Sequence, residues 1–151
     1  MKLHVSVQYG TGRAGLPASP TIRHWARAAL RDMKHSRVAL GVRIVGDAES
    51  ALLNCRFRRR RGPTNVLSFP FEPPSGLHSD ILGDLVICAP VVRREACQQN
   101  KSPRAHWAHM VVHGILHLRG YDHQKRRDAT VMETQEIRIL GELGFTNPYL
   151  S

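Results

Sequence analysis

The chain is organised around residues 113–123, which read HGILHLRGYDH. His113 and His117 are four residues apart, about one helical turn, so both project from one face if the segment is helical. Gly120 is the expected end of that helix, because glycine adopts a left-handed conformation at little cost. The chain can then turn back and bring His123 beside the other two histidines. The stretch therefore predicts a helix, a turn and three imidazoles gathered where they meet.

Three imidazole ligands with an open fourth position are typical of a catalytic zinc site. Two further histidines, His106 and His109, precede the stretch. A helix rises about 12 Å over the eight residues from His109 to His117, whereas tetrahedral ligand nitrogens lie only about 3.4 Å apart. We therefore expect His113, His117 and His123 to bind the metal ion. His109 is expected behind the ligands or in a groove, and His106 at the surface.

The residues next to the histidines in the sequence limit the reactions that the site could catalyse. In zinc proteases with the H-E-x-x-H motif, the residue after the first histidine is the general base. Here that residue is Gly114, which argues against such a peptidase and indicates a close approach of a strand or a substrate. Asp122 either orients a ligand histidine through its other ring nitrogen or caps the turn, and both roles stay open.

Charge and cysteine content limit the partners and the compartment. There are 22 Lys and Arg against 12 Asp and Glu, a net charge of +10. This favours a polyanionic partner, nucleic acid before an anionic membrane, with ordinary solubilising charge as the alternative. Three cysteines without a C-x-x-C pair are typical of a reducing compartment. With no signal peptide pattern and no membrane-length apolar stretch, we expect a cytoplasmic protein with no membrane partner.

Hydrophobic periodicity predicts the remaining elements. Strands are expected at residues 3–7, 38–44, 65–71 and 81–88, and helices at 20–34, 48–55, 90–99, from Ser102 through the histidine stretch, and at 129–143. The order predicts a single α+β domain over residues 1–151, with a mixed four-stranded sheet and about five helices on one face. The histidine helix is expected in the core. The short loop between the last two strands indicates that they are antiparallel.

These motifs resemble the YbeY family of bacterial endoribonucleases, also called ribosomal RNA maturation factors. Residues 113–123 match the family signature H-G-x-L-H-L-x-G-Y-D-H at every fixed position. Residues 63–70 match a second block, in which Asn65 stands where the family has Asp or Asn, and residues 82–87 match a third. Residues 132–144 resemble the C-terminal helix, so the resemblance covers roughly residues 45–145.

The resemblance implies a zinc-dependent endoribonuclease that acts on single-stranded RNA in 16S rRNA 3′-end processing and ribosome quality control. One zinc ion per chain would be held by His113, His117 and His123, and the small ribosomal subunit or ribosomal proteins would be partners. The functional arginine of the family falls on Arg58, five residues before Pro63. Because arginines crowd this segment, Arg59 remains the alternative. The other arginines expected to contact RNA are Arg56, Arg59, Arg60 and Arg61.

The chemistry of the residues agrees with this reading. Hydrolysis of a phosphodiester develops negative charge on its non-bridging oxygens, which a metal ion and an arginine stabilise. We expect a metal-activated water or hydroxide as the nucleophile, with attack by the RNA 2′-hydroxyl left open. Two other hypotheses remain: a zinc metallopeptidase, and a non-catalytic ribosome assembly factor whose metal is structural.

Overall fold

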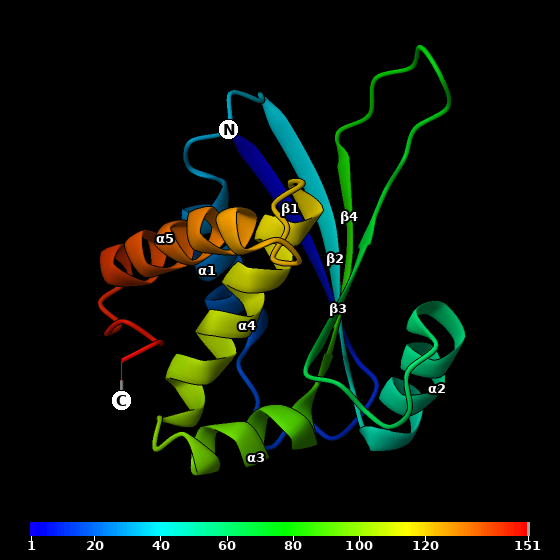
Figure 1. Cartoon of the computed structure of the whole chain (residues 1–151). Helices are drawn as coiled ribbons and strands as arrows, with labels where there is room; N and C mark the ends of the chain where they lie inside the picture. Colours follow the sequence, from blue (N-terminus) through cyan, green and yellow to red (C-terminus); the bar gives the residue numbers. More distant parts are fainter. Residues whose placement is uncertain (151) are drawn as a thin grey trace.

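A computed structural model describes residues 1–150 of the chain (Figure 1). Within this range it contains four strands and five α-helices. In chain order they are β1 (Lys2–Tyr9), α1 (Ser19–Leu30), β2 (Arg37–Val45), α2 (Asp47–Arg58), β3 (Val66–Pro70), β4 (Ile81–Cys88), α3 (Ala89–Gln98), α4 (Pro103–Leu118) and α5 (Arg126–Glu142). The predicted α+β architecture, with one mixed four-stranded sheet and five helices, is confirmed.

The strands are arranged in the order β1-β2-β4-β3. β1 pairs with β2 and β2 with β4 in parallel, whereas β3 pairs with β4 antiparallel, as predicted. β3 lies at an edge of the sheet. This position suits Pro70, because proline has no backbone N–H to donate to a neighbouring strand.

The sheet is covered on both faces. Successive side chains of a strand point to opposite faces, so Leu85 of β4 lies in the main core while Val86 lies in a smaller cluster on the other side. α2 covers that second face through Leu53. The expectation that all helices lie on one face is therefore wrong for α2 (Figure 1). On this second face β2 and β4 are apolar only toward their ends, where Val45, Val86 and Cys88 are buried and need cover, whereas Arg43 and Asp84 make the rest of that face polar.

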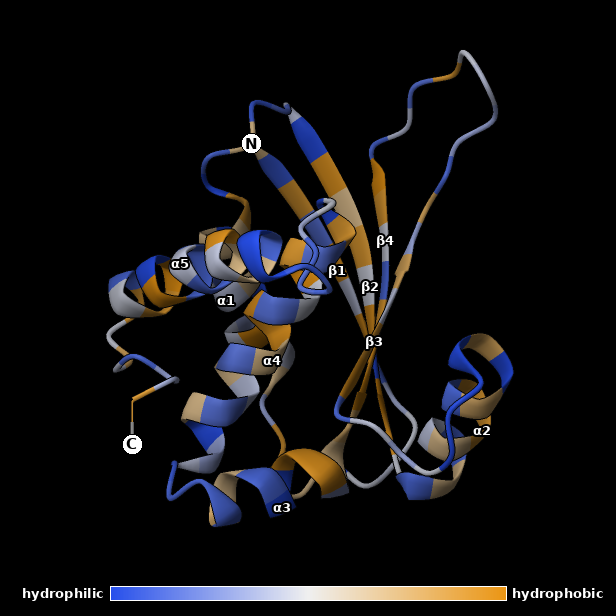
Figure 2. Ribbon diagram, in the orientation of Figure 1, coloured by the Kyte–Doolittle hydropathy of each residue, from blue (hydrophilic) through white to orange (hydrophobic). Residues whose placement is uncertain are grey.

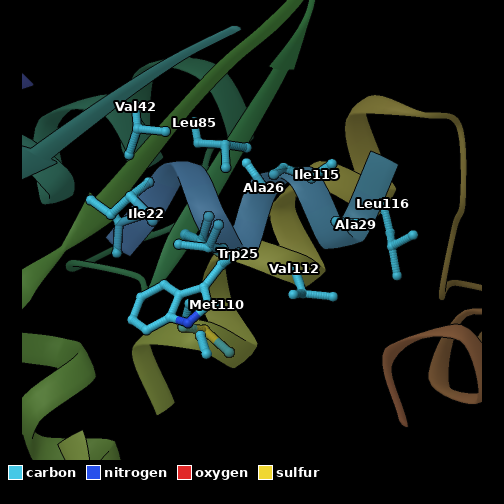
Figure 3. Packing of buried hydrophobic residues seen from close by; sticks show 14 of the residues in the cluster. Ile22, Trp25, Ala26, Ala29, Val42, Leu85, Met110, Val112, Ile115 and Leu116 are labelled. Atoms are coloured by element: carbon cyan, nitrogen blue, oxygen red, sulfur yellow. The ribbon is translucent and has the colours of Figure 1, made fainter. Parts of the chain in front are cut away.

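α4 is the central helix of the main core. Eleven of its 16 residues are buried, and it contacts α1, α3, α5, β3 and β4. Figure 3 shows side chains from α1, α4 and the sheet gathered in this core. A Cβ added at Gly114 would lie 2.8 Å from Leu85 Cδ2 and 3.2 Å from Val66 Cγ2. The expected close approach at Gly114 is thus made by strands of the sheet.

Some helix boundaries differ from the sequence prediction. α2 continues to Arg58 instead of ending at residue 55, and α5 begins at Arg126, three residues before the predicted start at 129. α2 ends because Arg59 takes a left-handed conformation (φ 54°) and its N–H bonds back to the carbonyls of Asn54 and Cys55. Arg58 therefore belongs to the last turn of a helix and not to the loop.

Candidate metal centre

Three histidines meet where α4 ends. His113 and His117 project from its last turns, and His123 comes from the segment between α4 and α5. The ring centroids lie 4.7 Å apart for His113–His117 and His117–His123, and 5.5 Å apart for His113–His123. One ring nitrogen from each lies within 4.8 Å of the others, so the group could hold a metal ion.

The turn that brings His123 back depends on Gly120, which has a φ of 98°. The N–H of Gly120 donates to the carbonyl of His117, and the N–H of Tyr121 to that of Leu116, both at 3.0 Å. These bonds satisfy carbonyls at the end of α4. The predicted helix end at Gly120 is confirmed.

Asp122 stabilises the same turn. Its Oδ1 accepts the backbone N–H of His123 at 2.7 Å and that of Gln124 at 3.1 Å. The Gln124 N–H is the main cause that lowers the pKa of Asp122. Among the hydrogen bonds found within residues 1–150, none joins Asp122 to a histidine ring. Of its two expected roles, the structure therefore provides the cap of the turn.

The ionisation state of the site suits a metal ion. Burial lowers the pKa of His117 to about 4, and the neighbouring His113 and His123 add to the effect. His117 is therefore neutral at neutral pH, which is the form in which imidazole binds metals. Three imidazole nitrogen donors suit zinc.

A buried carboxylate from α5 lies directly behind His113. Glu136 is fully buried (0% exposed). Its Oε1 accepts from His113 Nδ1 at 2.7 Å, and its Oε2 accepts from His109 Nε2 at 2.6 Å and from the Tyr149 hydroxyl at 2.5 Å. Burial alone raises the pKa of Glu136, but the hydrogen bonds from both histidines outweigh it and bring the pKa to about 2.

Glu136 contacts the histidine site but was not expected there from the sequence. A signal was present, because Met132, Glu136 and Leu140 follow one another at a spacing of four in α5, and all three are buried. A glutamate within an apolar helical stripe needs a buried partner. His109, expected behind the ligands, is such a partner: it contacts Glu136, which in turn contacts His113.

His109, His113 and Glu136 also lie close enough together to hold an ion. However, the carboxylate is 2.6 Å and 2.7 Å from the two ring nitrogens, whereas donors around one zinc ion lie about 3.4 Å apart. These distances are those of hydrogen bonds. We therefore treat this group as a support for the three-histidine site and not as a second metal site.

His106 was expected at the surface, but it is buried in the structure. It is 2% exposed, and its Nε2 lies 2.8 Å from Glu95 Oε1 on α3. The expectation was wrong because α3 packs on α4 and covers the side of the helix that carries His106, while Pro103 and Arg104 at the helix start remain exposed. Glu95 provides the polar partner that makes burial of an imidazole tolerable.

A cleft of about 600 Å³ opens onto the three histidines. Its lining includes residues 64–70 along β3, Arg58 from the end of α2, and Arg60 from the hydrophilic segment that follows (Figure 2). Arg58 thus faces the same space as His113 although they are 55 residues apart in the chain. Asp122 is the single carboxylate among the lining residues within 1–150, so the cleft is positively charged.

The other arginines of the run are placed differently. Arg56, Arg59 and Arg61 are not part of the cleft lining described for residues 1–150. The left-handed conformation of Arg59 redirects the chain directly after Arg58. Of the two alternatives for the functional arginine, Arg58 is thus the one that shares a cleft with the histidines.

Comparisons with known proteins point to one family. A family model described as "Endoribonuclease YbeY" matches residues 16–144. A protein of Methylococcus capsulatus named "Endoribonuclease YbeY" is 57% identical over 136 residues, which cover 90% of this chain and 89% of that protein. Proteins with the same name from Nitrosococcus oceani and Alkalilimnicola ehrlichii are 47% and 54% identical. These alignments cover 100% and 97% of this chain, and 99% and 91% of the respective relatives.

The fold also has a counterpart among solved structures. The solution structure of a Thermotoga maritima protein superposes with a TM-score of 0.57, over 97% of this chain and 99% of that one. The two sequences are 23% identical. This similarity supports the architecture of sheet and helices described above.

Proposed function

This chain belongs to the endoribonuclease YbeY family, and we propose that it cleaves single-stranded RNA with one zinc ion held by His113, His117 and His123. The observation that supports the proposal is the shared cleft of the three histidines and Arg58. A metal ion and a guanidinium that face the same space suit the two kinds of charge stabilisation that a phosphodiester needs.

Each residue has a distinct task in this proposal. The histidines bind the ion, which when bound supplies a Lewis acid and lowers the pKa of a water to about 7. Arg58 donates N–H groups to the non-bridging oxygens of the phosphate, where charge develops in the transition state. Arg60 holds the RNA backbone without reading its sequence. Arg56, Arg59 and Arg61 would contact RNA outside the cleft.

The biological setting follows from the family and from the charge. We propose that the substrate is ribosomal RNA, with 16S rRNA 3′-end maturation and ribosome quality control as the process, and the small ribosomal subunit or its proteins as partners. None of the helices in residues 1–150 has the length and hydrophobicity that a membrane crossing requires. The cysteines Cys55, Cys88 and Cys97 are all free, which supports a cytoplasmic location.

The two alternative functions, a zinc peptidase and a non-catalytic assembly factor, have less support than RNA cleavage. A zinc peptidase of the H-E-x-x-H type needs a carboxylate at position 114, but Gly114 packs against Leu85 and Val66, and its carbonyl accepts a hydrogen bond from Ser68. A non-catalytic assembly factor with a structural metal is disfavoured because His117 and His123 line an open cleft. Structural zinc sites are usually closed by four protein ligands.

The proposal is tested by metal content and RNA cleavage on the same preparations. We expect about one zinc per wild-type chain by mass spectrometry, and cleavage of single-stranded RNA that a chelator abolishes and added zinc restores. His117→Ala should lose both metal and activity. His24→Ala, which removes an exposed histidine of α1, is the matched control and should keep both.

Three results would contradict the proposal. Folded His113→Ala and His117→Ala proteins that cut RNA as fast as the parent would rule out the metal site as the catalytic centre. Cleavage of casein but not of RNA would favour the peptidase. A metal-replete protein that a chelator destabilises, but that never cleaves RNA, would favour the assembly factor.

A further inference from the structure

We propose that Glu136 is a positioning residue, which together with His109 and Tyr149 fixes the ring of His113 so that its Nε2 faces the metal ion. The inference rests on the proposed role of His113 as a metal ligand. It adds a residue from α5 and one from the C-terminal segment to a site otherwise formed by α4 and the turn after it.

The first argument is the tautomer of His113. An ionised carboxylate can only accept hydrogen bonds. The 2.7 Å contact between His113 Nδ1 and Glu136 Oε1 therefore places the proton on Nδ1 and leaves the lone pair on Nε2. A neutral imidazole with its proton on the far nitrogen is the form that binds a metal, and a carboxylate at that nitrogen also makes the ligand more basic.

The second argument is the burial of Glu136. Removing a carboxylate from water costs several kcal/mol unless donors surround it. Glu136 is fully buried in α5, and three donors reach it: His109 Nε2, His113 Nδ1 and the Tyr149 hydroxyl. Leucine would fill this buried position without the free-energy cost of burying a carboxylate. The presence of glutamate therefore indicates that its hydrogen bond to His113 is needed at the site.

The third argument is that the two carboxylate oxygens of Glu136 have different hydrogen-bond donors. His109 and Tyr149 both donate to Oε2, and Oε1 is left to His113. The rings of His109 and Tyr149 also meet edge to face, with centroids 5.5 Å apart. Tyr149 is itself held by its backbone N–H, which donates to Asn147 Oδ1 at 2.9 Å. The carboxylate therefore cannot rotate away from His113 without breaking its bonds to two other residues, His109 of α4 and Tyr149 of the C-terminal segment.

His113 differs in this respect from the other two ligands. For His117 and His123, the contact of a ring nitrogen within hydrogen-bond distance found in residues 1–150 is the 2.9 Å approach between His117 Nε2 and His123 Nδ1. His113 is 21% exposed at its side chain and already oriented by the protein, while His123 is exposed on a turn. Among the three proposed ligands, His113 is thus the one whose ring is oriented by a buried carboxylate.

The test uses nitrogen NMR of histidine-labelled protein without metal, followed by zinc titration against a competing chelator. In the wild type, we expect His113 to carry its proton on Nδ1. Glu136→Leu should give a mixture of tautomers and bind zinc about 10–100-fold more weakly, the range found when such supporting partners are removed. Glu136→Gln keeps one acceptor oxygen and should lie between Glu136→Leu and the wild type.

Milder changes protect the test against misfolding. Tyr149→Phe removes one donor to Oε2 and little volume, and should weaken zinc binding several-fold with an unchanged circular dichroism spectrum. Glu133→Gln, a half-buried glutamate on the same helix, is the matched control and should bind zinc like the wild type.

Two outcomes would overturn the inference. One is a wild-type His113 with its proton on Nε2. The other is zinc affinity within twofold of the wild type in both Glu136→Gln and Tyr149→Phe. A wild type that binds zinc through its histidines, shows the expected tautomer and yet leaves RNA intact would contradict the proposed function while supporting the role of Glu136.

Discussion

At the scale of single residues, Gly114 determines how closely α4 approaches the sheet. We expect Gly114→Ala to cost about 1–3 kcal/mol through overpacking, because its Cβ would lie 2.8 Å from Leu85 Cδ2. A gain in helix propensity of about 1 kcal/mol offsets part of this cost, so the net destabilisation should reach about 2 kcal/mol at most. The measurement is the free energy of unfolding from urea denaturation.

Gly141 provides the matched control for Gly114. It also lies within a helix, α5, but a Cβ added there would meet nothing within 4 Å. Gly141→Ala should therefore stabilise the protein by about 0.5–1 kcal/mol through helix propensity alone. If both substitutions were stabilising, the close packing of α4 on the sheet would not be a constraint on position 114.

Arg58 is the residue whose substitution should separate catalysis from stability. It is exposed at the end of α2, so Arg58→Ala should leave the melting temperature almost unchanged. Loss of a donor that stabilises transition-state charge typically lowers kcat about 10²–10³-fold. Single-turnover cleavage of a short RNA measures this effect. Arg61→Ala, outside the cleft, should cost far less, and equal losses at both positions would argue for general charge instead.

The residues of the site differ in how far the sequence alone identifies them. His113, His117 and His123 lie within one short motif, where helical periodicity and a glycine are enough to bring them together. Glu136 is 23 residues from its partner His113, and their contact depends on how α5 crosses α4. Spacing along a chain contains no information on that crossing, so Glu136 could be noticed only as a polar residue out of place.

At the scale of elements, Glu95 of α3 joins three parts of the fold. Its carboxylate accepts from His106 of α4 at 2.8 Å and from Asn65, directly before β3, at 3.1 Å. The hydrogen bond from His106 is the main cause that lowers the pKa of Glu95, with that from Asn65 adding to it against the effect of burial. The ionised carboxylate therefore stabilises the packing of α3 on α4 and β3.

This pairing predicts how stability changes with pH. A carboxyl group whose pKa is lower in the folded state contributes stability above its unfolded pKa, about 4.5, and loses it as the pH falls through the folded value. Glu95→Gln should therefore melt below the wild type at pH 7, and the two melting temperatures should converge as the pH falls below about 4.5. Scanning calorimetry across pH measures both.

Glu72, exposed in the segment between β3 and β4, provides the control for that experiment. Glu72→Gln should follow the wild type at every pH. A constant difference in melting temperature between Glu95→Gln and the wild type from pH 7 to pH 3 would show that the charge of Glu95 contributes nothing, and that only the shape of its side chain matters.

Sequence patterns predicted which segments form helices and strands better than they predicted where those helices pack on the sheet. The alternating strands, the antiparallel pairing of β3 with β4 and the buried position of α4 all follow from hydropathy and loop length. The placement of α2 on the second face does not, because an amphipathic helix can cover either side of a sheet. The extension of α2 to Arg58 was also missed, since the arginine run hides a helical turn within what reads as a charged loop.

At the scale of the whole molecule, the net charge of +10 should make RNA binding strongly dependent on salt. For single strands, the logarithm of the binding constant falls with the logarithm of salt concentration with a slope of about −0.7 per neutralised phosphate. Replacing both Arg58 and Arg60 by alanine should therefore reduce the magnitude of the slope by about 1.4 if each contacts one phosphate. Fluorescence anisotropy at several salt concentrations provides the measurement.

A pair of exposed basic residues outside the cleft serves as the comparison. Arg23 and Lys34 are exposed and are not part of the cleft lining. Replacing both by alanine should change the affinity only slightly and leave the slope intact. If the two double variants had the same slope, RNA would be bound diffusely over the surface and the cleft would not be its principal site.

The position of His123 on the turn after Gly120 has a consequence for the exchange of the ion. The proposed ligands His113 and His117 belong to the mostly buried helix α4, whereas His123 belongs to an exposed segment between α4 and α5, and exposed segments open at a lower free-energy cost than buried helices. Release of the ion should therefore begin with detachment of this segment, at a rate far above that of unfolding. Proteases should cut the same segment faster when the ion has left, so nicking there would report occupancy in crude extracts, where neither RNA cleavage nor mass spectrometry is easily interpreted.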